Sequence, residues 1–464
     1  MLDFISPTNV YGLPTSEYGR LKKLIEVYLT HQSKNAQKNK YYEGKISLGS
    51  VNLGIALPDG LTGLEIGCAW GAKCVDVLAA RSMFDGYVTE SGGENPELQQ
   101  LVTSNRLIAE YGKAARDELK YGCTFATLSR DPKTGCKIRF HSPRTAAAIW
   151  DGDKGQIDCG FAIIDTAPDN SGQLWSPSLI YFYTENAVWV LKRSGAVWSA
   201  TYYSQRMGRP LMEPLIWNAT SDKPFGRSRI KEPVRRLIDG YVRTIANASI
   251  GLEFSTSPQK YLLGVTDDQY EAVTSNKFRQ YVGAIIAATN NPESGEKPDF
   301  GQLPQGNLAP HVEMIRVLAT QFSAATGLPV TDTGVVNDAN PTSSDAIEAQ
   351  TKTLVGLAEA LNTGNTGALR NIALMALAVA NDATMDELTD EQKSIVPHFK
   401  NPAMPSVAAT ADAAVKIAST RPAFAQTDTF LEMIGFSQAD IRRIRNQEAR
   451  ARGNAMLSEL EGIA

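Results

Sequence analysis

Two stretches of the chain repeat apolar residues at alternating four- and three-residue steps. The first runs from Glu232 to Phe254 and the second from about Leu308 to Thr326. The residues are Val234, Ile238, Tyr241, Ile245, Ala248 and Leu252 in the first, and Leu308, Val312, Ile315, Ala319 and Phe322 in the second. This spacing places one apolar stripe along a helix and is typical of helices that pack lengthwise against another helix. We therefore expect two long helices whose stripes serve assembly.

Helical patterns also occupy the N-terminal region. Apolar residues recur on one face from Ser16 to roughly Glu43, followed by a Gly- and Pro-rich loop. Two further helices are predicted, one from about Cys68 to Arg81 and one from Pro96 to Leu119, which we expect to be interrupted at Gly112.

The C-terminal region is predicted to be helical as well. A capping-box spacing starts a helix within Pro341 to Asp345, and Gly364 and Gly367 are expected to kink or break it. A buried helix from Ile372 to Ala380 follows, and the tail from Asp428 onward is predicted to form a pair of helices.

Between Tyr121 and Trp217 the pattern changes to the alternation of strands. The predicted strands are Cys123–Ser129, Lys137–His141, Ile157–Thr166, Leu179–Tyr183, Ala187–Lys192 and Ala196–Tyr203. Connectors rich in turn-forming residues join several of them, so an antiparallel meander of hairpins is expected. Helical, strand and helical regions follow one another, which predicts an α+β protein with segregated classes.

Two polar segments adjoin the long helices. Residues 255–307, rich in Pro, Gly and Asn, lie between the helices and indicate a small inserted module. Gly327 and Pro329 end the second helix, and the polar loop Val330 to Ser344 that follows has no basic residue. The polar side chains singled out in this loop are Thr331, Asp332, Thr333, Asn337, Asp338 and Asn340.

The composition is that of a soluble globular protein. Its 464 residues, 43% hydrophobic and 21% charged, suffice for about three domains. With 46 basic and 50 acidic residues the net charge is -4, so bulk charge attracts neither nucleic acid nor an anionic membrane. Five cysteines without a Cys-x-x-Cys spacing favour a reducing compartment and no zinc site. We recognise no secretory signal and no apolar run near the ~20 residues of a membrane span.

Motifs for enzymatic chemistry are weak. Leu64 to Gly71 is similar to the first motif of Rossmann-type methyltransferases, but Ala69 stands at the middle glycine position and a helix start is favoured. Asp151 to Asp158 could pass for part of a calcium loop, yet it lacks the final bidentate glutamate, so a hairpin turn is favoured. The four histidines are scattered, without hydrolase or nucleotide-binding motifs. We predict no catalytic residue, no metal and no cofactor.

One local excess of positive charge precedes the first long helix. It consists of Arg227, Arg229, Lys231, Arg235 and Arg236. Two interpretations stay open, contact with phosphate groups and pairing within or between subunits. Pairing is favoured, because exposed basic faces are commonly solvated or paired.

Several short motifs follow one another along nearly the whole chain. They are Tyr41 to Gly44, Trp70, Cys74 to Arg81, Phe84 to Tyr87, His141 to Pro143, Gly208 to Pro210, Phe225 to Ser228, Leu237 to Tyr241 and Ser343 to Ala346. In their order and spacing, these motifs resemble those of the portal proteins of tailed bacteriophages, in the SPP1-like siphophage group. At Ser343 to Asp345 the chain departs from the family, which often has a Ser-Gly pair there.

The resemblance implies a portal fold with a mainly helical wing, stem and crown, an antiparallel β meander in the wing and a small mixed α/β clip. It assigns residues 1–222 to the wing, 223–254 to the first stem helix, 255–307 to the clip, 308–326 to the second stem helix, 327–344 to the tunnel loop, 345–399 to a kinked wing helix and the helix after it, and 400–464 to the crown. The implied stem interface comprises Val234, Ile238, Tyr241, Ile245, Leu252, Val312, Ile315 and Phe322.

The resemblance also implies a non-enzymatic function. Portal subunits form a ring, usually of twelve in the virion, at one capsid vertex, and the ring conducts double-stranded DNA during packaging and ejection. The implied partners are the large terminase subunit, the major capsid and scaffold proteins and head-tail adaptor proteins, with no membrane, after assembly in the host bacterial cytoplasm. Two alternatives stay open: a methyltransferase-like enzyme that uses S-adenosylmethionine at Gly67 to Gly71, and a structural ring protein other than a portal.

Overall fold

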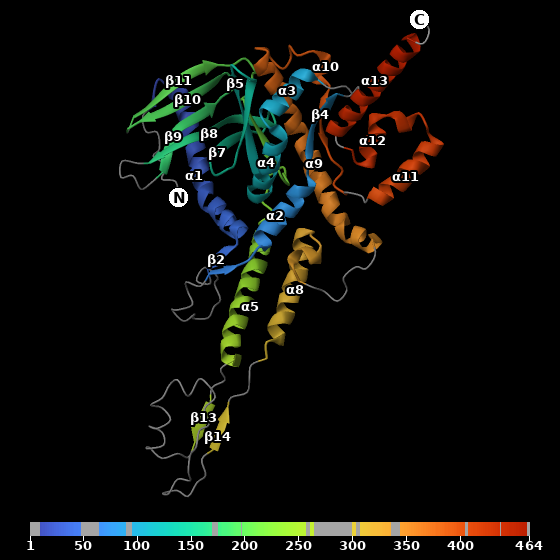
Figure 1. Ribbon diagram of the computed structural model, residues 1–464. Helices are drawn as coiled ribbons and strands as arrows, with labels where there is room; N and C mark the ends of the chain where they lie inside the picture. Colours follow the sequence, from blue (N-terminus) through green and yellow to red (C-terminus); the bar gives the residue numbers. More distant parts are fainter. Residues whose placement is uncertain are drawn as a thin grey trace, which may run out of the picture. The chain divides into compact units, whose positions relative to one another are not determined.

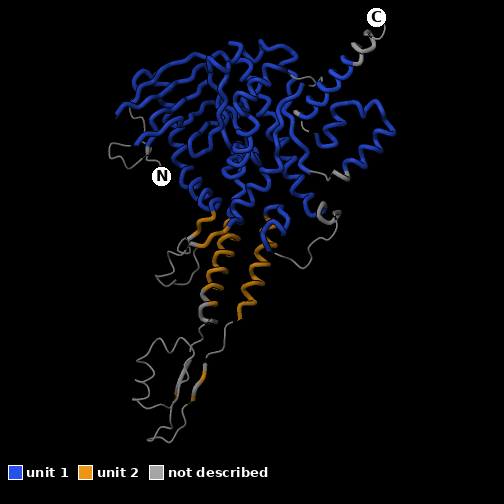
Figure 2. Tube along the Cα trace, viewed as in Figure 1, with its two compact units in different colours: residues 1–43, 69–234, 326–464 blue, residues 44–68, 235–325 orange. Residues whose placement is uncertain are grey.

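The computed structural model describes most of the chain, which divides into two compact units (Figure 2). Unit 1 comprises residues 1–43, 69–234 and 326–464, and unit 2 comprises residues 44–68 and 235–325. The described residues are 10–47, 65–89, 95–168, 175–195, 197–256, 260–263, 299–302, 307–335, 344–403, 407–436 and 438–461.

Unit 1 contains a six-stranded sheet (Figure 1). Its order is β1-β11-β10-β9-β8-β7, and neighbouring strands are antiparallel except for β1, which runs parallel to β11. The strands are β1 (Val10–Tyr11), β7 (Ala146–Asp151), β8 (Gln156–Pro168), β9 (Trp175–Tyr183), β10 (Ala187–Ser194) and β11 (Val197–Ser204). The predicted antiparallel meander is confirmed for β8 to β11.

Three other strands of this region form a separate sheet of order β12-β5-β6. They are β5 (Cys123–Asp131), β6 (Gly135–His141) and β12 (Met212–Ile216). The expectation of a single meander is therefore wrong in part. The sequence interpretation also missed β7 and β12, and β7 begins with three alanines, which have low strand propensity.

Each sheet packs against a helix. α1 (Thr15–Glu43) lays Leu21, Leu24 and Tyr28 on the six-stranded sheet, in a core shared with Phe161 and Trp198. α9 (Ser344–Ala380) contacts all three strands of the smaller sheet. The buried helix predicted from Ile372 to Ala380 is confirmed, because it is the C-terminal end of α9 and Ile372 to Val379 are buried.

Helix α9 runs unbroken through Gly364 and Gly367. The expectation that these glycines break the helix is therefore wrong. The expectation that they kink it stays a prediction.

The helix predicted from Pro96 to Leu119 is two helices, α3 (Pro96–Ser104) and α4 (Leu107–Tyr121). The interruption expected at Gly112 is wrong, since Gly112 lies inside α4. The chain turns instead at Arg106, whose φ of 51° is left-handed. Asn105 fixes this turn, because its Nδ2 donates to the carbonyl of Cys136 at 2.9 Å and its Oδ1 accepts from the amide of Ile138 at 2.9 Å.

The remaining elements of unit 1 surround these layers. α2 (Trp70–Arg81) packs on α1, α4 and α9, and β4 (Phe84–Thr89) pairs with β15 (Ile395–Phe399). After α10 (Asp390–Lys393) and β15, the C-terminal region contains α11 (Val407–Thr420), α12 (Asp428–Ile434) and α13 (Gln438–Glu461). The helix pair predicted from Asp428 onward is thus confirmed. No described helix is long and apolar enough to cross a membrane.

Unit 2 contains the two long helices. α5 (Glu232–Thr256), which belongs to this unit from Arg235 onward, and α8 (Ala309–Thr326) match the predicted ranges closely. A methyl group added at Gly240 would lie 3.2 Å from Leu318, and one added at Gly251 would lie 3.3 Å from Leu308. Gly251 comes after Gly240 on α5, whereas its neighbour Leu308 comes before Leu318 in the chain. The two helices are therefore antiparallel neighbours.

Two short antiparallel sheets complete the described part of unit 2. β13 (Lys260–Leu263) pairs with β14 (Asp299–Gln302), within the inserted segment. β2 (Lys45–Ser47) pairs with β3 (Glu65–Gly67), and β3 belongs to the methyltransferase-like motif. Because β3 pairs antiparallel with β2, its one partner among the described residues, the helix start preferred for this motif is the better interpretation.

Candidate assembly surfaces and channel loop

The apolar stripe predicted on α5 lies beside its contact with α8. At about 100° per residue, Gly240 and Gly251 share one side of the helix, and Tyr241, Ile245 and Leu252 lie roughly 100° further round. Tyr241 and Ile245 are half-buried, and Leu252 is 49% exposed. Glycine lets the two helices approach closely, so α8 is contacted by a side of α5 that the sequence interpretation did not single out.

The buried positions on α5 follow a different spacing from the predicted stripe. Val234 and Ile238, which belong to the stripe, are buried, and so are Val242 and Ala246, which do not. Residues four positions apart are only about 40° apart around a helix, so these four residues form one buried face. The stripe is therefore covered within the chain only at its N-terminal end.

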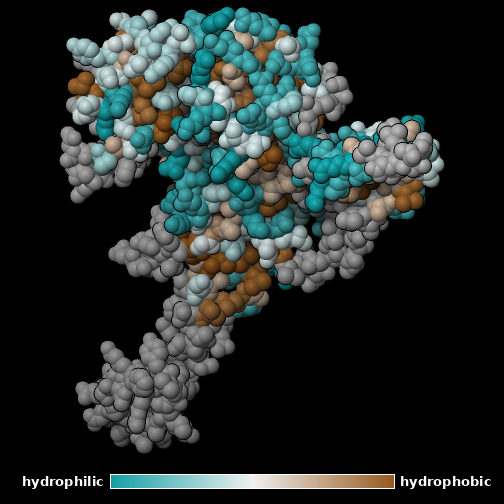
Figure 3. All heavy atoms as spheres, turned by 45° about the horizontal axis from the view of Figure 1, so that its top comes forward, coloured by the Kyte–Doolittle hydropathy of each residue, from teal (hydrophilic) through white to brown (hydrophobic). Residues whose placement is uncertain are grey.

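Helix α8 carries apolar side chains on both flanks of its inner side. Leu318, Ala319 and Phe322 are buried and define that side, with Ile315 half-buried among them. Val312 and Met314 lie roughly 80° away from it in opposite directions, and they are 52% and 46% exposed. Val317 is also exposed. In Figure 3 hydrophobic residues gather on the visible surface of this pair of helices.

Arg229 of the basic cluster is buried in unit 1. Its Nε donates to the carbonyl of Cys74 at 2.5 Å, and its Nη2 donates to the carbonyl of Thr326 at 2.6 Å. The guanidinium also lies 5.9 Å from the ring of Trp217, and burial lowers its pKa. Arg229 is therefore a structural anchor, and its assignment as a phosphate or intersubunit contact is wrong.

The other four basic residues are more accessible. Arg227 forms an exposed ion pair with Asp222 at 3.5 Å. Lys231 and Arg236 are exposed, and Arg235 is half-buried. Both interpretations of these four side chains, contact with phosphate and pairing, stay open.

The first part of the predicted channel loop is a 3-10 helix, η3 (Val330–Thr333). The indole Nε1 of Trp70 donates to the carbonyl of Thr333 at 3.1 Å, and the Thr333 hydroxyl donates to the carbonyl of Val330 at 2.6 Å. Thr331 is exposed, and Asp332 and Thr333 are half-buried. The predicted loop residues Asn337, Asp338 and Asn340 lie outside the described residues.

Glycine makes the start of this loop possible. Gly327 has a φ of +70°, and a methyl group there would lie 2.8 Å from Leu357 of α9. The turn after α8 is thus packed against α9 on one side and held by Arg229 at Thr326 on the other. The loop leaves α8 from a fixed point.

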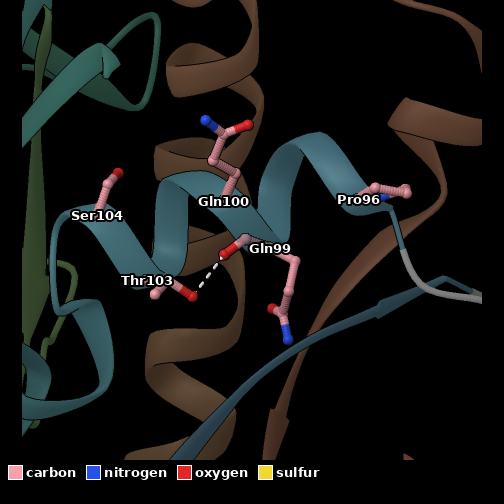
Figure 4. A pocket seen from close by; sticks show the side chains of 5 residues that line it. All are labelled: Pro96, Gln99, Gln100, Thr103 and Ser104. Atoms are coloured by element: carbon pink, nitrogen blue, oxygen red, sulfur yellow. Dashed lines mark hydrogen bonds between the residues drawn. The ribbon is translucent and has the colours of Figure 1, made fainter. Parts of the chain in front are cut away.

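Two hollows in the described part of the chain are lined by side chains with structural contacts. A shallow hollow of about 520 Å³ on α3 is lined by Pro96, Gln99, Gln100, Thr103 and Ser104, with the Thr103 hydroxyl bonded to the carbonyl of Gln99 (Figure 4). A second, of about 320 Å³, contains the Arg209–Glu213 ion pair, and Asn371 donates to Glu213 at 2.8 Å. This pair is largely buried and already hydrogen-bonded, as expected of a structural contact.

No metal site is found among the described residues. The calcium-like sequence is a hairpin turn between β7 and β8, as predicted. One carboxylate oxygen of Asp151 accepts from the amides of Asp153 and Lys154, at 3.0 and 3.1 Å.

The described residues thus include a pair of helices with exposed apolar flanks and the anchored start of a polar loop. No protein-family model matches the chain. It is similar to the portal protein of Mycobacterium phage D29, with 23% identity over 447 residues that cover 92% of this chain and 88% of the relative. The portal protein of Mycobacterium phage L5 is 23% identical over 408 residues, which cover 85% and 81%. These matches confirm the resemblance to tailed-bacteriophage portal proteins.

Two solved structures were also found to be similar. One is a chain from the neck of a native GTA particle computed with C12 symmetry, with a TM-score of 0.43 and 13% identity over 79% of this chain and 89% of that chain. The other is from the neck of an empty GTA particle computed with C6 symmetry, with a TM-score of 0.44 and 14% identity over 77% and 87%.

Proposed function

We propose that the chain is the portal, or connector, protein of a tailed bacteriophage. It forms a ring at one vertex of the capsid, and double-stranded DNA passes through the ring during packaging and ejection. The observation that carries this proposal is the similarity to phage portal proteins along 92% of the chain. No described feature favours the methyltransferase alternative.

The apolar surfaces of unit 2 support a ring. A closed ring joins one flank of each subunit to the opposite flank of the next, so it needs two different apolar surfaces per subunit. Val312 and Met314 lie on opposite flanks of α8, and the exposed part of the α5 stripe adds Leu252. Contiguous apolar surface is costly in a monomer and is covered by neighbours in a ring.

The elements of the chain suit the parts of a portal. On this proposal α5 and α8 are the stem, the segment with β13 and β14 is the clip, and residues 1–222 are the wing. Residues 345–399 return to the wing, and 400–464 form the crown. The ring has twelve subunits in the virion.

The loop that follows α8 suits a channel wall. From Val330 to Ser344 it has Thr, Asn, Asp and Gly residues but no Lys or Arg. Every phosphate bound by a cation adds salt-dependent affinity that opposes sliding, whereas a polar wall without cations does not. We propose that residues 332–340 face the lumen.

The ring would serve as a docking platform. Its partners on this proposal are the large terminase subunit during packaging, the major capsid and scaffold proteins during head assembly, and head-tail adaptor proteins afterwards. It would assemble in the host bacterial cytoplasm and remain at the portal vertex of the virion, without a membrane.

Negative-stain electron microscopy of the purified full-length protein tests the proposal. We expect rings with an open axial channel wide enough for duplex DNA. Compact monomers would contradict the proposal, and rings without such a channel would favour a structural ring protein of another kind. DNA binding by the isolated ring should be weak, so tight binding with a steep salt dependence would contradict a sliding channel.

A further inference from the structure

Five polar side chains form a buried hydrogen-bonded chain between α4, α9 and the end of α2. The Ser82 hydroxyl lies 2.8 Å from the Tyr111 hydroxyl and donates to Asn362 Oδ1 at 2.6 Å. Asn365 Nδ2 lies 3.3 Å from the Tyr111 hydroxyl and donates to Glu118 Oε2 at 2.8 Å. Glu118 and Asn365 are both fully buried. The chain therefore ends at a carboxyl group without access to water.

Two acceptor atoms at the end of this chain have no hydrogen-bond donor. They are Glu118 Oε1 and Asn365 Oδ1, which belong to the two side chains already joined by Asn365 Nδ2. A carboxylate has no proton to donate and an amide oxygen can only accept, so an ionised Glu118 leaves both atoms unsatisfied. A proton on Glu118 supplies the missing donor. A buried unsatisfied polar atom is costly, so the protonated form is favoured.

No positive charge compensates the Glu118 carboxyl among the described residues. The ionisable groups that face it are the Tyr111 hydroxyl on α4 and the Cys123 thiol at the start of β5, and burial raises the pKa of both. From α9 and the end of α2 it meets only the neutral chain of Asn365, Asn362 and Ser82.

The charged residues on the same helix as Glu118 have contacts elsewhere. Arg116 pairs with Asp76 at 3.5 Å, and Lys120 Nζ lies over the Tyr42 ring at 4.1 Å. Asp117 interacts with Lys120 and Arg144. A buried carboxylate without a cation is strongly disfavoured.

We propose that Glu118 is held as a neutral carboxylic acid whose O–H donates to Asn365, so that an acid–amide pair fixes α9 on α4. In this pair each side chain donates one hydrogen bond and accepts one. The pair sets the rotation of α9, because a turn of the helix would bury both groups without partners. Loss of the proton at alkaline pH breaks one bond of the pair and loosens α9.

Other buried contacts agree with a fixed position for this helix. The Tyr87 hydroxyl donates to the carbonyl of Leu369 at 2.9 Å, and Arg370 Nη2 donates to the carbonyl of Lys393 at 2.6 Å. Burial raises the pKa of Tyr87, so its hydroxyl stays protonated across the neutral range. The Glu118–Asn365 pair is therefore the part of the attachment that responds to pH.

The sign of the pH effect follows from burial, which raises the pKa of Glu118 to about 8 from an ordinary value of 4.5. The folded chain keeps the proton at a pH where the unfolded chain has lost it. This contribution to stability is fully present below about pH 4.5 and is lost as the pH rises through about 8. Stability should therefore decline across the neutral range because of this one group.

The test compares the melting temperatures of the full-length protein and its Glu118→Gln variant at pH 5, 7 and 9. Glutamine has the same shape and can form the same two bonds with Asn365 without a titrating proton. We expect melting temperatures within roughly 2 °C of each other at pH 5, and the variant roughly 5 °C or more above the parent at pH 9. A difference that is independent of pH would overturn the proposal.

Two further measurements keep the test decisive if the variant folds poorly. The infrared C=O band of a protonated carboxyl should be present in the parent at pH 7 and absent from Glu118→Gln; its absence from the parent would contradict the proposal. Asn365→Leu removes both hydrogen bonds of the pair but leaves Glu118 buried, so this variant should melt well below the parent at pH 5, where the pair is intact. If Asn365→Leu melts like the parent at pH 5, Glu118 acts without Asn365 and the acid–amide pair is wrong.

Discussion

Arg229 and Asn105 of unit 1 are buried polar residues with partners inside the chain, whereas apolar side chains on the two long helices of unit 2 remain at the surface. Arg229 is buried and bonded to two main-chain carbonyls, and Asn105 is bonded to two strand residues. By contrast Leu252, Val312 and Met314 are close to half exposed on helices that already contact each other. The contacts of Arg229 and Asn105 are internal, whereas on the ring proposal the exposed flanks of α5 and α8 contact neighbouring subunits.

This difference separates two kinds of mutation. Substitutions inside unit 1 should change the stability of each subunit and leave association intact as long as the subunit folds. Substitutions on the exposed flanks of α5 and α8 should change association and leave the subunit folded. The comparison is wrong if either kind of substitution has the other effect.

The largest expected effect is the loss of the ring in Ile245→Asp. Ile245 is half-buried on the predicted stripe of α5, and an aspartate there would place an unpaired charge in an apolar contact. We expect sedimentation to show monomers and circular dichroism to show the helix content of the parent protein.

Thr320→Asp on α8 is the matched control. Thr320 is exposed and lies on the side of α8 away from Leu318 and Phe322. This variant should assemble like the parent. If Ile245→Asp assembles as well, the stripe is not an interface.

The sequence predicted the long helices because their limits depend on local signals. α5 begins at Glu232 and α8 ends at Thr326, where Gly327 adopts a φ of +70° that favours glycine. Their apolar stripes could be recognised too, since periodicity alone places residues on one face. Which face contacts the partner helix could not, because Gly240 and Gly251 have no side chain to enter the pattern.

The sequence analysis missed the features that depend on contacts between residues far apart in the chain. The end of α3 depends on Asn105 bonding to Cys136 and Ile138, more than thirty residues away. Arg229 stands in a basic cluster that looks solvated, and only its contact with the carbonyls of Cys74 and Thr326 makes it an anchor. Such residues have ordinary local sequence, so their roles become visible only in the fold.

A smaller effect is expected from Arg229→Met, which tests how much the buried contacts of Arg229 stabilise unit 1. The substitution leaves the carbonyls of Cys74 and Thr326 buried without this donor, so the free energy of unfolding should fall by about 2 kcal/mol. Denaturant titration measures this loss, and Arg229→Lys, which keeps one donor group, should lose less. Unchanged stability in Arg229→Met would mean that the anchor is dispensable.

His141 should make unit 1 sensitive to mild acid. Its ring is hydrogen-bonded to the Thr127 hydroxyl at 3.0 Å, and burial, with help from Arg139, lowers its pKa to about 4. Because the unfolded chain takes up a proton near pH 6.5, this contribution is present above that pH and is lost as the pH falls toward 4. We expect His141 to contribute a loss of about 2 kcal/mol between pH 7 and pH 4.5 in denaturant titrations, measured as the difference between the parent and His141→Gln, because Glu118 acts in the opposite direction in both proteins. His141→Gln should show a smaller decline, and an equal decline in both proteins would exclude His141 as its cause.

The smallest expected effect is a gain of stability in Gly112→Ala. Gly112 lies inside α4, and a methyl group there would meet nothing within 4 Å. Alanine restricts the unfolded chain and favours the helix, so the free energy of unfolding should rise by roughly 0.5–1 kcal/mol.

Gly122→Ala, at the end of the same helix, should have the opposite effect, because Gly122 has a φ of +113° and a methyl group would lie 3.2 Å from the backbone of Arg227. Thermal melting of both variants measures the contrast, and neither should change the assembly state. A dissociated Gly112→Ala ring would show that association depends on the interior of unit 1 after all.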